Sequence, residues 1–217
     1  MSPVPGDQPV SVGDAVSYGW SAYWKNLGPM LLIAVVVLVI NAAFSGLSNA
    51  VDSNLAQILV QIAGTLVSLL VTLGWLRIAL AITSGARPQV GDLFTVPGFG
   101  SFIVASILFY IGAVIGFLLL VVPGIIFVAT FGFYGFVIAE RGEEVGIIES
   151  LARSAELTRG YRWRLFGLAL VLLLINIVGL FACLVGIVFT SGITLIAWAY
   201  TYRRLSGAPV EYAAWGL

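Results

Sequence analysis

Long apolar runs that do not alternate with polar residues constrain the fold of this chain more than any other feature. One of them, residues 30–41, carries no charge and no polar side chain before its final Asn41. A transmembrane helix needs about 20 apolar residues, whereas a membrane β-strand alternates over about ten. Only 9% of the residues are charged, against about 25% in water-soluble domains. The sequence therefore predicts an all-α, polytopic membrane protein.

Six runs have the length or composition of a membrane-spanning helix. The fourth is short and the second is long, which favours tilt or partial embedding in the bilayer. Amphipathic stretches between the runs predict additional helices lying on the cytoplasmic face. The predicted spans are residues 29–48, 56–83, 101–121, 124–139, 165–185 and 187–202.

The basic residues predict the orientation of these spans. The ten Lys and Arg residues lie before span 1, around the connection between spans 2 and 3, between spans 4 and 5, or after span 6. Cytoplasmic loops are enriched in Lys and Arg, so both termini are expected in the cytoplasm. The first 16 residues lack the basic and apolar regions of a signal peptide. A bacterial protein of the cell inner membrane fits this pattern and the preference for Arg over Lys.

The chain also shows a threefold order of elements. A Val-Gly pair at 12–13, 90–91 and 145–146 begins each of three stretches that lead into an apolar hairpin. We predict a single six-span domain of three parallel units, each an interfacial helix followed by a hairpin. The units cover residues 11–84, 88–139 and 143–204, between a flexible N-terminus at 1–10 and a short cytoplasmic tail at 205–217.

The first of these stretches is rich in aromatic residues. Tyr18, Trp20, Tyr23 and Trp24 lie within seven positions, and aromatic rings with polar edges favour the headgroup zone of a bilayer. The stretch therefore predicts an interfacial anchor, with lipid recognition as the alternative.

Residues 139–164 hold ten of the twenty charged residues. The pattern after Glu143 is helical, with Glu149 and Arg153 placed as a favourable i,i+4 ion pair and Gly160 suited to the end of the helix. We predict a surface helix that lies on the cytoplasmic face. Its apolar face is expected to comprise Ile148, Leu151, Ala152 and Ala155.

This helix and the entry to span 5 form a candidate interaction surface. Guanidinium groups bind phosphate in a bidentate manner, so the surface suits anionic headgroups or a phosphate on a partner. Simple anchoring by cytoplasmic charges with local ion pairs explains the same residues. The candidate surface comprises Arg153, Ser154, Thr158, Arg159, Arg162, Trp163 and Arg164.

The sequence SLARSAELTRG at 150–160, followed by Trp163-Arg164 and an apolar span, resembles a poorly characterised bacterial family of multi-span membrane proteins. It is also similar to the membrane domain fused to some glycerophosphoryl diester phosphodiesterases. The Val-Pro-Gly turn at 122–124 fits the same pattern. In those enzymes catalysis belongs to a separate soluble domain, for which this chain has no room. The resemblance implies a membrane module without activity.

Polar residues inside the spans are the remaining candidates. Arg77 either snorkels to the interface or pairs with Glu140. Pro123 and Gly124 are expected to form the turn of the second hairpin. Interhelical hydrogen bonds are a simpler explanation for Asn41 and Asn176 than a transport site. A polar stripe along span 2, which suits either a substrate path or the bundle centre, comprises Gln57, Gln61, Thr65, Ser68 and Thr72.

The composition argues against an enzymatic or metal-binding site. The chain has no histidine and one cysteine, Cys183, and we find no phosphate-binding loop, metalloprotease motif or nucleophile elbow. We therefore expect a non-enzymatic protein without a cofactor or metal. Its expected partners are membrane lipids and either a membrane protein or a second copy, but not nucleic acid. The alternative is a small-solute or lipid transporter; an enzyme would need Glu140, Arg77 and Arg153 to converge.

Overall fold

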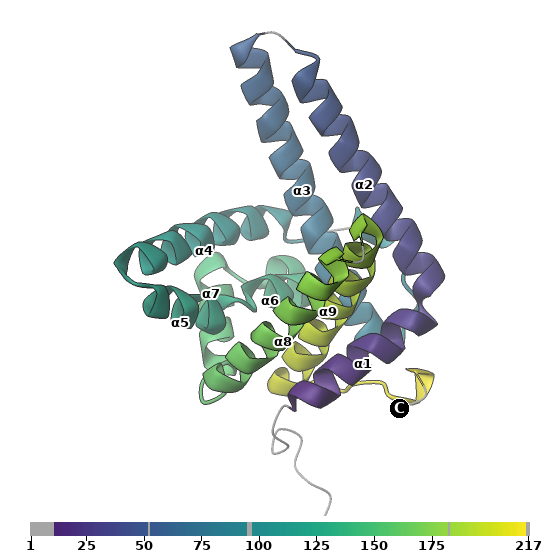
Figure 1. The fold of residues 1–217 in the computed structure, drawn as a ribbon. Helices are drawn as coiled ribbons and strands as arrows, with labels where there is room; N and C mark the ends of the chain where they lie inside the picture. The colour runs from purple at the N-terminus through teal and green to yellow at the C-terminus, as the bar shows by residue number, and fades with distance from the viewer. Residues whose placement is uncertain (1–10, 52, 95–96, 182, 216–217) are drawn as a thin grey trace, which may run out of the picture.

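The structure is a computed structural model that describes residues 11–51, 53–94, 97–181 and 183–215, without the side chains of 183–185 and 214. The predicted flexible N-terminus, 1–10, lies outside these residues. Every regular element in the described ranges is helical, so the all-α prediction is confirmed (Figure 1). In order, the elements are α1 (Val12–Lys25), α2 (Leu27–Asn49), α3 (Asn54–Thr83), η1 (Val90–Leu93), α4 (Phe99–Leu119), α5 (Val121–Phe131), α6 (Tyr134–Arg141), η2 (Gly142–Glu144), α7 (Ile147–Leu157), α8 (Arg162–Phe181), α9 (Cys183–Ser206) and η3 (Ala213–Trp215).

Five segments of the described chain are long and apolar enough to cross a membrane: α2, α3, α4, the segment Val121–Glu144 and α8. The protein is therefore embedded in a membrane. The sixth predicted span lies within α9, a helix of 24 residues that is not among these five segments. Helix α9 packs against α1, α3 and α8 in the middle of the molecule. A helix that faces protein rather than lipid can carry Tyr200, Thr201 and Tyr202 near its end.

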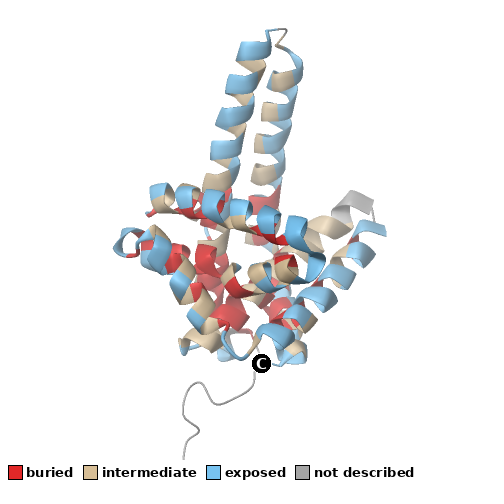
Figure 2. Cartoon of the chain, turned by 90° about the vertical axis from the view of Figure 1, so that its left-hand side faces the viewer, coloured by how far each residue is buried: buried red, intermediate tan, exposed pale blue. Residues whose placement is uncertain are grey.

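Three hairpins project from a common core. The pairs α2–α3, α4–α5 and α8–α9 each pack side by side, and their tips point in different directions (Figures 1 and 2). Buried residues gather where the three hairpins meet, whereas the distal parts are exposed (Figure 2). The exposed parts are apolar, with Phe181 at 84% exposure and Leu118 at 81%. Such surfaces suit lipid rather than water.

The core is built on aromatic packing between helices that are distant in sequence. Tyr18 of α1 stacks on Tyr200 of α9 with ring centroids 4.7 Å apart, and its hydroxyl donates to the Glu211 carbonyl oxygen at 2.9 Å. Trp215 is buried, and its indole N–H donates to the Ile82 carbonyl at 3.1 Å. The segment after α9 therefore folds back onto α1 and α3 rather than extending as a free tail.

Helix α1 divides the predicted aromatic anchor into two groups. Tyr18 and Tyr23 are fully buried against α9, whereas Trp20 and Trp24 are exposed and border a groove on the α8–α9 hairpin. Only the two tryptophans are thus available to a bilayer interface. The elements follow the predicted order, with α1, η1 and α7 before the three hairpins. The second interfacial element is a single 3₁₀ turn, and the relation among the three units stays a prediction.

The second hairpin differs from the prediction at its turn. The chain reverses at Leu120, which has extended backbone angles, before Pro123 is reached. Pro123 and Gly124 lie in the first turn of α5, where a proline is tolerated because amides there have no intrahelical partner. Gly124 is buried against α4, and a Cβ added to Gly116 would lie 3.0 Å from the Gly124 Cα. The glycine therefore permits close packing within the hairpin rather than forming its turn.

Candidate functional site: a broken span and three cavities

The fourth predicted span is broken into α5 and α6 at Gly132 and Phe133. The Phe133 backbone N–H donates to Ser154 Oγ at 3.0 Å, and the Ser154 hydroxyl donates to the Thr130 carbonyl oxygen at 3.0 Å. The Thr158 hydroxyl lies 3.0 Å from the same carbonyl. Ser154 and Thr158 are fully buried. Side chains of α7 thus supply hydrogen bonds to backbone groups at the break, where an intact helix would supply its own.

This arrangement corrects the predicted orientation of α7. The buried face is a stripe of hydroxyls at four-residue spacing, Ser150, Ser154 and Thr158. Two members of the predicted apolar face point outward, since Ile148 is 70% exposed and Ala152 is also exposed. Leu151 and Ala155 are half-buried. The prediction was wrong because it ranked residues by apolarity, whereas the broken span presents backbone polar groups that only hydrogen-bonding side chains can satisfy.

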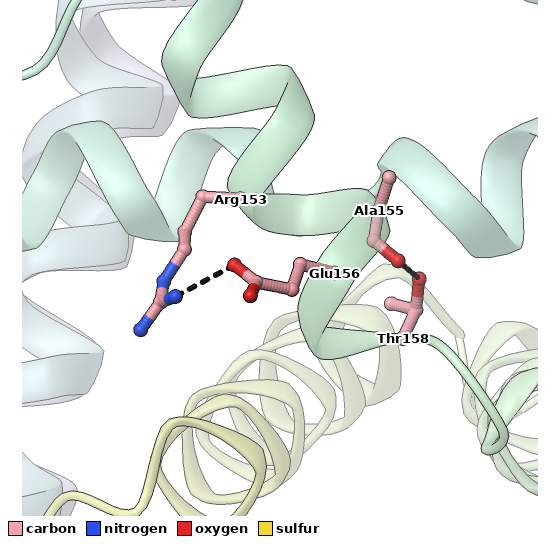
Figure 3. A network of polar contacts seen from close by, with 4 residues as sticks. All are labelled: Arg153, Ala155, Glu156 and Thr158. Atoms are coloured by element: carbon pink, nitrogen blue, oxygen red, sulfur yellow. Dashed lines mark hydrogen bonds and ion pairs between the residues drawn. The ribbon is translucent and has the colours of Figure 1, made fainter.

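The predicted ion pair of α7 also changes partner. Arg153 lies 2.7 Å from Glu156 Oε2 instead of pairing with Glu149 (Figure 3). Glu149 faces the backbone N–H of Gly146 at 3.5 Å, as a capping residue does at a helix start. The Thr158 hydroxyl also lies 3.3 Å from the Ala155 carbonyl (Figure 3). Arg153 and Glu156 are exposed to partly exposed, so their pair adds little stability.

The candidate interaction surface therefore divides. Ser154 and Thr158 are internal and cannot contact a partner. Arg159, Arg162, Trp163 and Arg164 remain exposed. Trp163 is 82% exposed and meets the edge of Phe166 with ring centroids 6.3 Å apart.

An apolar crevice of about 500 Å³ lies beside the break, between the α4–α5 hairpin and the α8–α9 hairpin. Gly132 and Phe133 of the break form part of its wall. Walls also come from α3, α4, α6, α8 and α9, and its lining is almost wholly aliphatic and aromatic. Among the lining residues are Phe109, Phe117, Phe136, Phe166, Ala169 and Trp198.

A second cavity, of about 440 Å³, contains the predicted intramembrane pair. Arg77 and Glu140 both line it, together with Arg87, Asp92 and Arg203. Glu140 accepts a hydrogen bond from the Tyr202 hydroxyl at 2.6 Å. The two members of the pair are thus brought to one polar cavity, rather than to the apolar interior. Arg153 does not line this cavity, so the three residues of the enzymatic alternative do not share it.

The polar stripe of span 2 faces α2. Gln61, Thr65 and Ser68 line a groove of about 480 Å³ whose other wall includes Asn41 and Ser45. The Asn41 amide donates to the Val37 carbonyl within its own helix at 2.8 Å, so an interhelical bond from this donor is absent in the described residues. Gln57 lies outside the groove, and its amide donates to the Val51 carbonyl at the hairpin tip. Asn176 does bond across helices, to Thr194 Oγ1 at 2.7 Å.

Residues 59–202 match a family described as a domain of unknown function, DUF7847. The chain belongs to this family. The DUF7847 segment begins inside α3 and ends inside α9, so it includes the broken span, α7 and most of the residues around the apolar crevice. An uncharacterised protein of Mycobacterium tuberculosis, Rv2560, is 27% identical over 237 positions, covering 94% of this chain and 71% of that protein. No solved structure matches the DUF7847 chain.

These comparisons agree with the predicted kinship to poorly characterised proteins and give no activity. They offer no support for the similarity to the membrane domain of glycerophosphoryl diester phosphodiesterases, which stays a prediction. Sequence reasoning missed the broken span and the hydroxyls that hold it. One signal was present, because serine or threonine recurs at 150, 154 and 158 on one helix face.

Proposed function

We propose that this protein is a non-enzymatic module of the bacterial cytoplasmic membrane that holds lipid acyl chains between its hairpins. In this proposal the protein inserts with both termini in the cytoplasm, as the distribution of Lys and Arg predicts. The observation that carries the proposal is the apolar crevice between α4–α5 and α8–α9, about 500 Å³ in volume.

The lining of the crevice favours a hydrocarbon occupant. Its aliphatic and aromatic walls offer almost no polar group to a solute, and ligand cavities of this kind select for apolar shape. An empty apolar cavity is destabilising because the lining atoms lose dispersion contacts on one side. The hairpins on both sides expose apolar residues, so the chains of the surrounding lipids are the molecules at hand.

The start of α8 supports a position for the headgroup. Phe166 and Ala169 line the crevice, and Arg162 and Trp163 lie four and three residues before Phe166 on the same helix face. Both are exposed. A chain in the crevice would therefore carry its headgroup toward an aromatic ring and a guanidinium, a pairing that suits the phosphate level of a bilayer.

Filling the crevice tests the proposal. We expect Ala169→Phe to reduce the number of phospholipids retained by the protein in a mild detergent, as counted by native mass spectrometry. The matched control is Ala42→Phe, which adds the same ring at an exposed position of α2 outside every cavity described above. Equal lipid retention by the two variants and the unmodified protein would refute acyl-chain binding in the crevice.

A transporter or lipid translocator is the second candidate. The polar groove between α2 and α3 favours it, since Gln61, Thr65 and Ser68 present polar atoms along a hairpin that otherwise exposes apolar residues. Proteoliposomes with a fluorescent phospholipid in the inner leaflet would measure translocation. On this candidate Gln61→Ala abolishes transfer, whereas Gln57→Ala acts mainly on the hairpin tip. Transfer unaffected by Gln61→Ala would eliminate the groove as the path.

A further inference from the structure

We infer that the cavity lined by Arg77, Arg87 and Arg203 is a binding site for a phosphate group. It lies where the end of α3, the segment after it, the end of α6 and the end of α9 meet. Its volume of about 440 Å³ falls within the range of small-molecule sites, roughly 300–1,000 Å³. This inference does not rest on the function proposed above, because the acyl-chain crevice is a separate cavity.

The balance of charge in the cavity favours an anion. Three arginines line the cavity together with two acidic residues, Asp92 and Glu140. Each carboxylate already has a neutral donor close by. Asp92 Oδ2 accepts from the Gln89 backbone N–H at 3.0 Å, and Glu140 Oε2 accepts from the Tyr202 hydroxyl at 2.6 Å. The cavity therefore carries a net positive charge, with its carboxylate oxygens partly occupied.

Arg203 gives the second, independent observation. Its two terminal nitrogens lie near neutral carbonyl oxygens, those of Leu80 at 3.2 Å and Pro209 at 3.4 Å. Its Nε is buried and has no hydrogen-bond partner within the described ranges. No ion pair with a carboxylate is found for Arg203 in that part of the chain. A buried N–H without a hydrogen-bond partner is costly, and an oxyanion that accepts from it removes this cost.

The guanidinium chemistry indicates phosphate more than a simple carboxylate. Arginine donates through a planar fork that matches two phosphate oxygens at once, and several arginines can share the three or four oxygens of one phosphate. In the predicted orientation the cavity lies on the cytoplasmic side. The phosphate could come from a lipid headgroup of the inner leaflet or from a free phosphate compound in the cytoplasm.

The position of the arginine cavity is compatible with a lipid headgroup as the source of the phosphate. Leu76 of α3 and Phe136 of α6 line the acyl-chain crevice, and Leu80 and Glu140 line the arginine cavity. The two cavities are thus one helical turn apart along both helices. A headgroup phosphate near the end of an acyl chain would lie within that range.

The experiment uses the full chain and two probes. Inorganic phosphate is titrated into detergent-purified protein, with sodium chloride at matched ionic strength as reference, and the unfolding midpoint is followed by tryptophan fluorescence. In parallel, native mass spectrometry counts phosphatidylglycerol retained from nanodiscs, against nanodiscs of a phosphate-free galactosyl diacylglycerol. The variants are Arg87→Gln, whose side chain is exposed, and Arg203→Lys, which keeps the charge and loses the fork. Lys25→Gln is the control, as an exposed cation outside the cavity and outside the candidate interaction surface.

We expect each cavity variant to weaken binding about tenfold or more, the effect of losing one charge-assisted hydrogen bond, while Lys25→Gln binds as the unmodified protein does. Stabilisation by inorganic phosphate identifies a free phosphate compound as the ligand class. Retention of phosphatidylglycerol alone identifies the lipid headgroup. If neither probe distinguishes Arg87→Gln and Arg203→Lys from Lys25→Gln, the inference is overturned. Ala169→Phe should leave the phosphate response intact, so failure of the acyl-chain proposal is recognised separately.

Discussion

Ser154→Ala should lower the free energy of unfolding more than the same change at Ser150, the other fully buried serine of α7. In Ser154→Ala the Phe133 N–H loses its acceptor at 3.0 Å, and the Thr130 carbonyl loses one of two hydroxyl donors. The site is fully buried, so water does not replace the hydroxyl at low cost.

The magnitude follows from counting the groups left without partners. A buried amide without an acceptor costs about 1–3 kcal/mol, and membrane-protein hydrogen bonds measured by double-mutant cycles average about 0.6 kcal/mol. We therefore expect Ser154→Ala to lower the free energy of unfolding by about 2 kcal/mol. Thr158→Val should cost about 1 kcal/mol, because the Thr130 carbonyl keeps Ser154 as a donor.

Ser150→Ala is the matched control. Ser150 is as fully buried and lies one turn earlier on the same face, but its hydroxyl donates only to the Ile147 carbonyl of its own helix at 2.7 Å. That carbonyl retains the ordinary amide donor of the helix, so the loss should stay below about 1 kcal/mol.

Reversible unfolding in mixed micelles, titrated with SDS and followed by tryptophan fluorescence, gives the free energies. Hydrogen exchange in a peptide that contains residues 130–135 gives the local effect, and faster exchange is expected in Ser154→Ala only. Equal destabilisation by Ser154→Ala and Ser150→Ala, with unchanged exchange at the break, would refute the role of α7 in holding the broken span.

Three further predictions concern packing, pH and topology. Gly74→Ala should destabilise by more than about 2 kcal/mol, because its Cβ would lie 2.6 Å from the Leu93 Cα, whereas Gly28→Ala, with no atom within 4 Å, should be neutral or stabilising in the same SDS titration. Burial raises the pKa of Tyr18 in the folded protein, whereas the phenol of the unfolded chain ionises near pH 10. The contribution of neutral Tyr18 to the free energy of unfolding should therefore be fully present below about pH 10 and fall as the pH rises above it. Tyr18→Phe should make that fall shallower and cost about 1 kcal/mol at neutral pH through the lost bond to Glu211; an unchanged alkaline slope would contradict it. In a chain without Cys183, cysteines at Ser53 and Arg159 should label from the outside and the inside respectively, and the reverse would contradict the predicted orientation.

The membrane-spanning segments could be predicted from sequence because their cause is local. About 20 apolar residues in a row leave few alternatives to a helix in lipid, and five segments of the described chain have the length and composition of a span. The interfacial helix after Gly146 was also predictable, since its periodicity and its acidic start are local features. The face that this helix buries was not predictable. Ile148 is exposed and Ser154 is buried because the broken span packed against the helix presents backbone polar groups.

The sequence by itself determined the all-helical membrane class, the approximate bounds of most spans and a charged helix after Gly146, since each follows from properties of neighbouring residues. Only the tertiary structure decided that span 4 breaks at Gly132 and Phe133, and that α7 turns its hydroxyls toward the break. Only the tertiary structure brought Arg77 and Glu140 into one cavity with Arg203. These features depend on backbone groups and charges more than twenty residues apart in the chain, and their partners are fixed by packing rather than by local pattern.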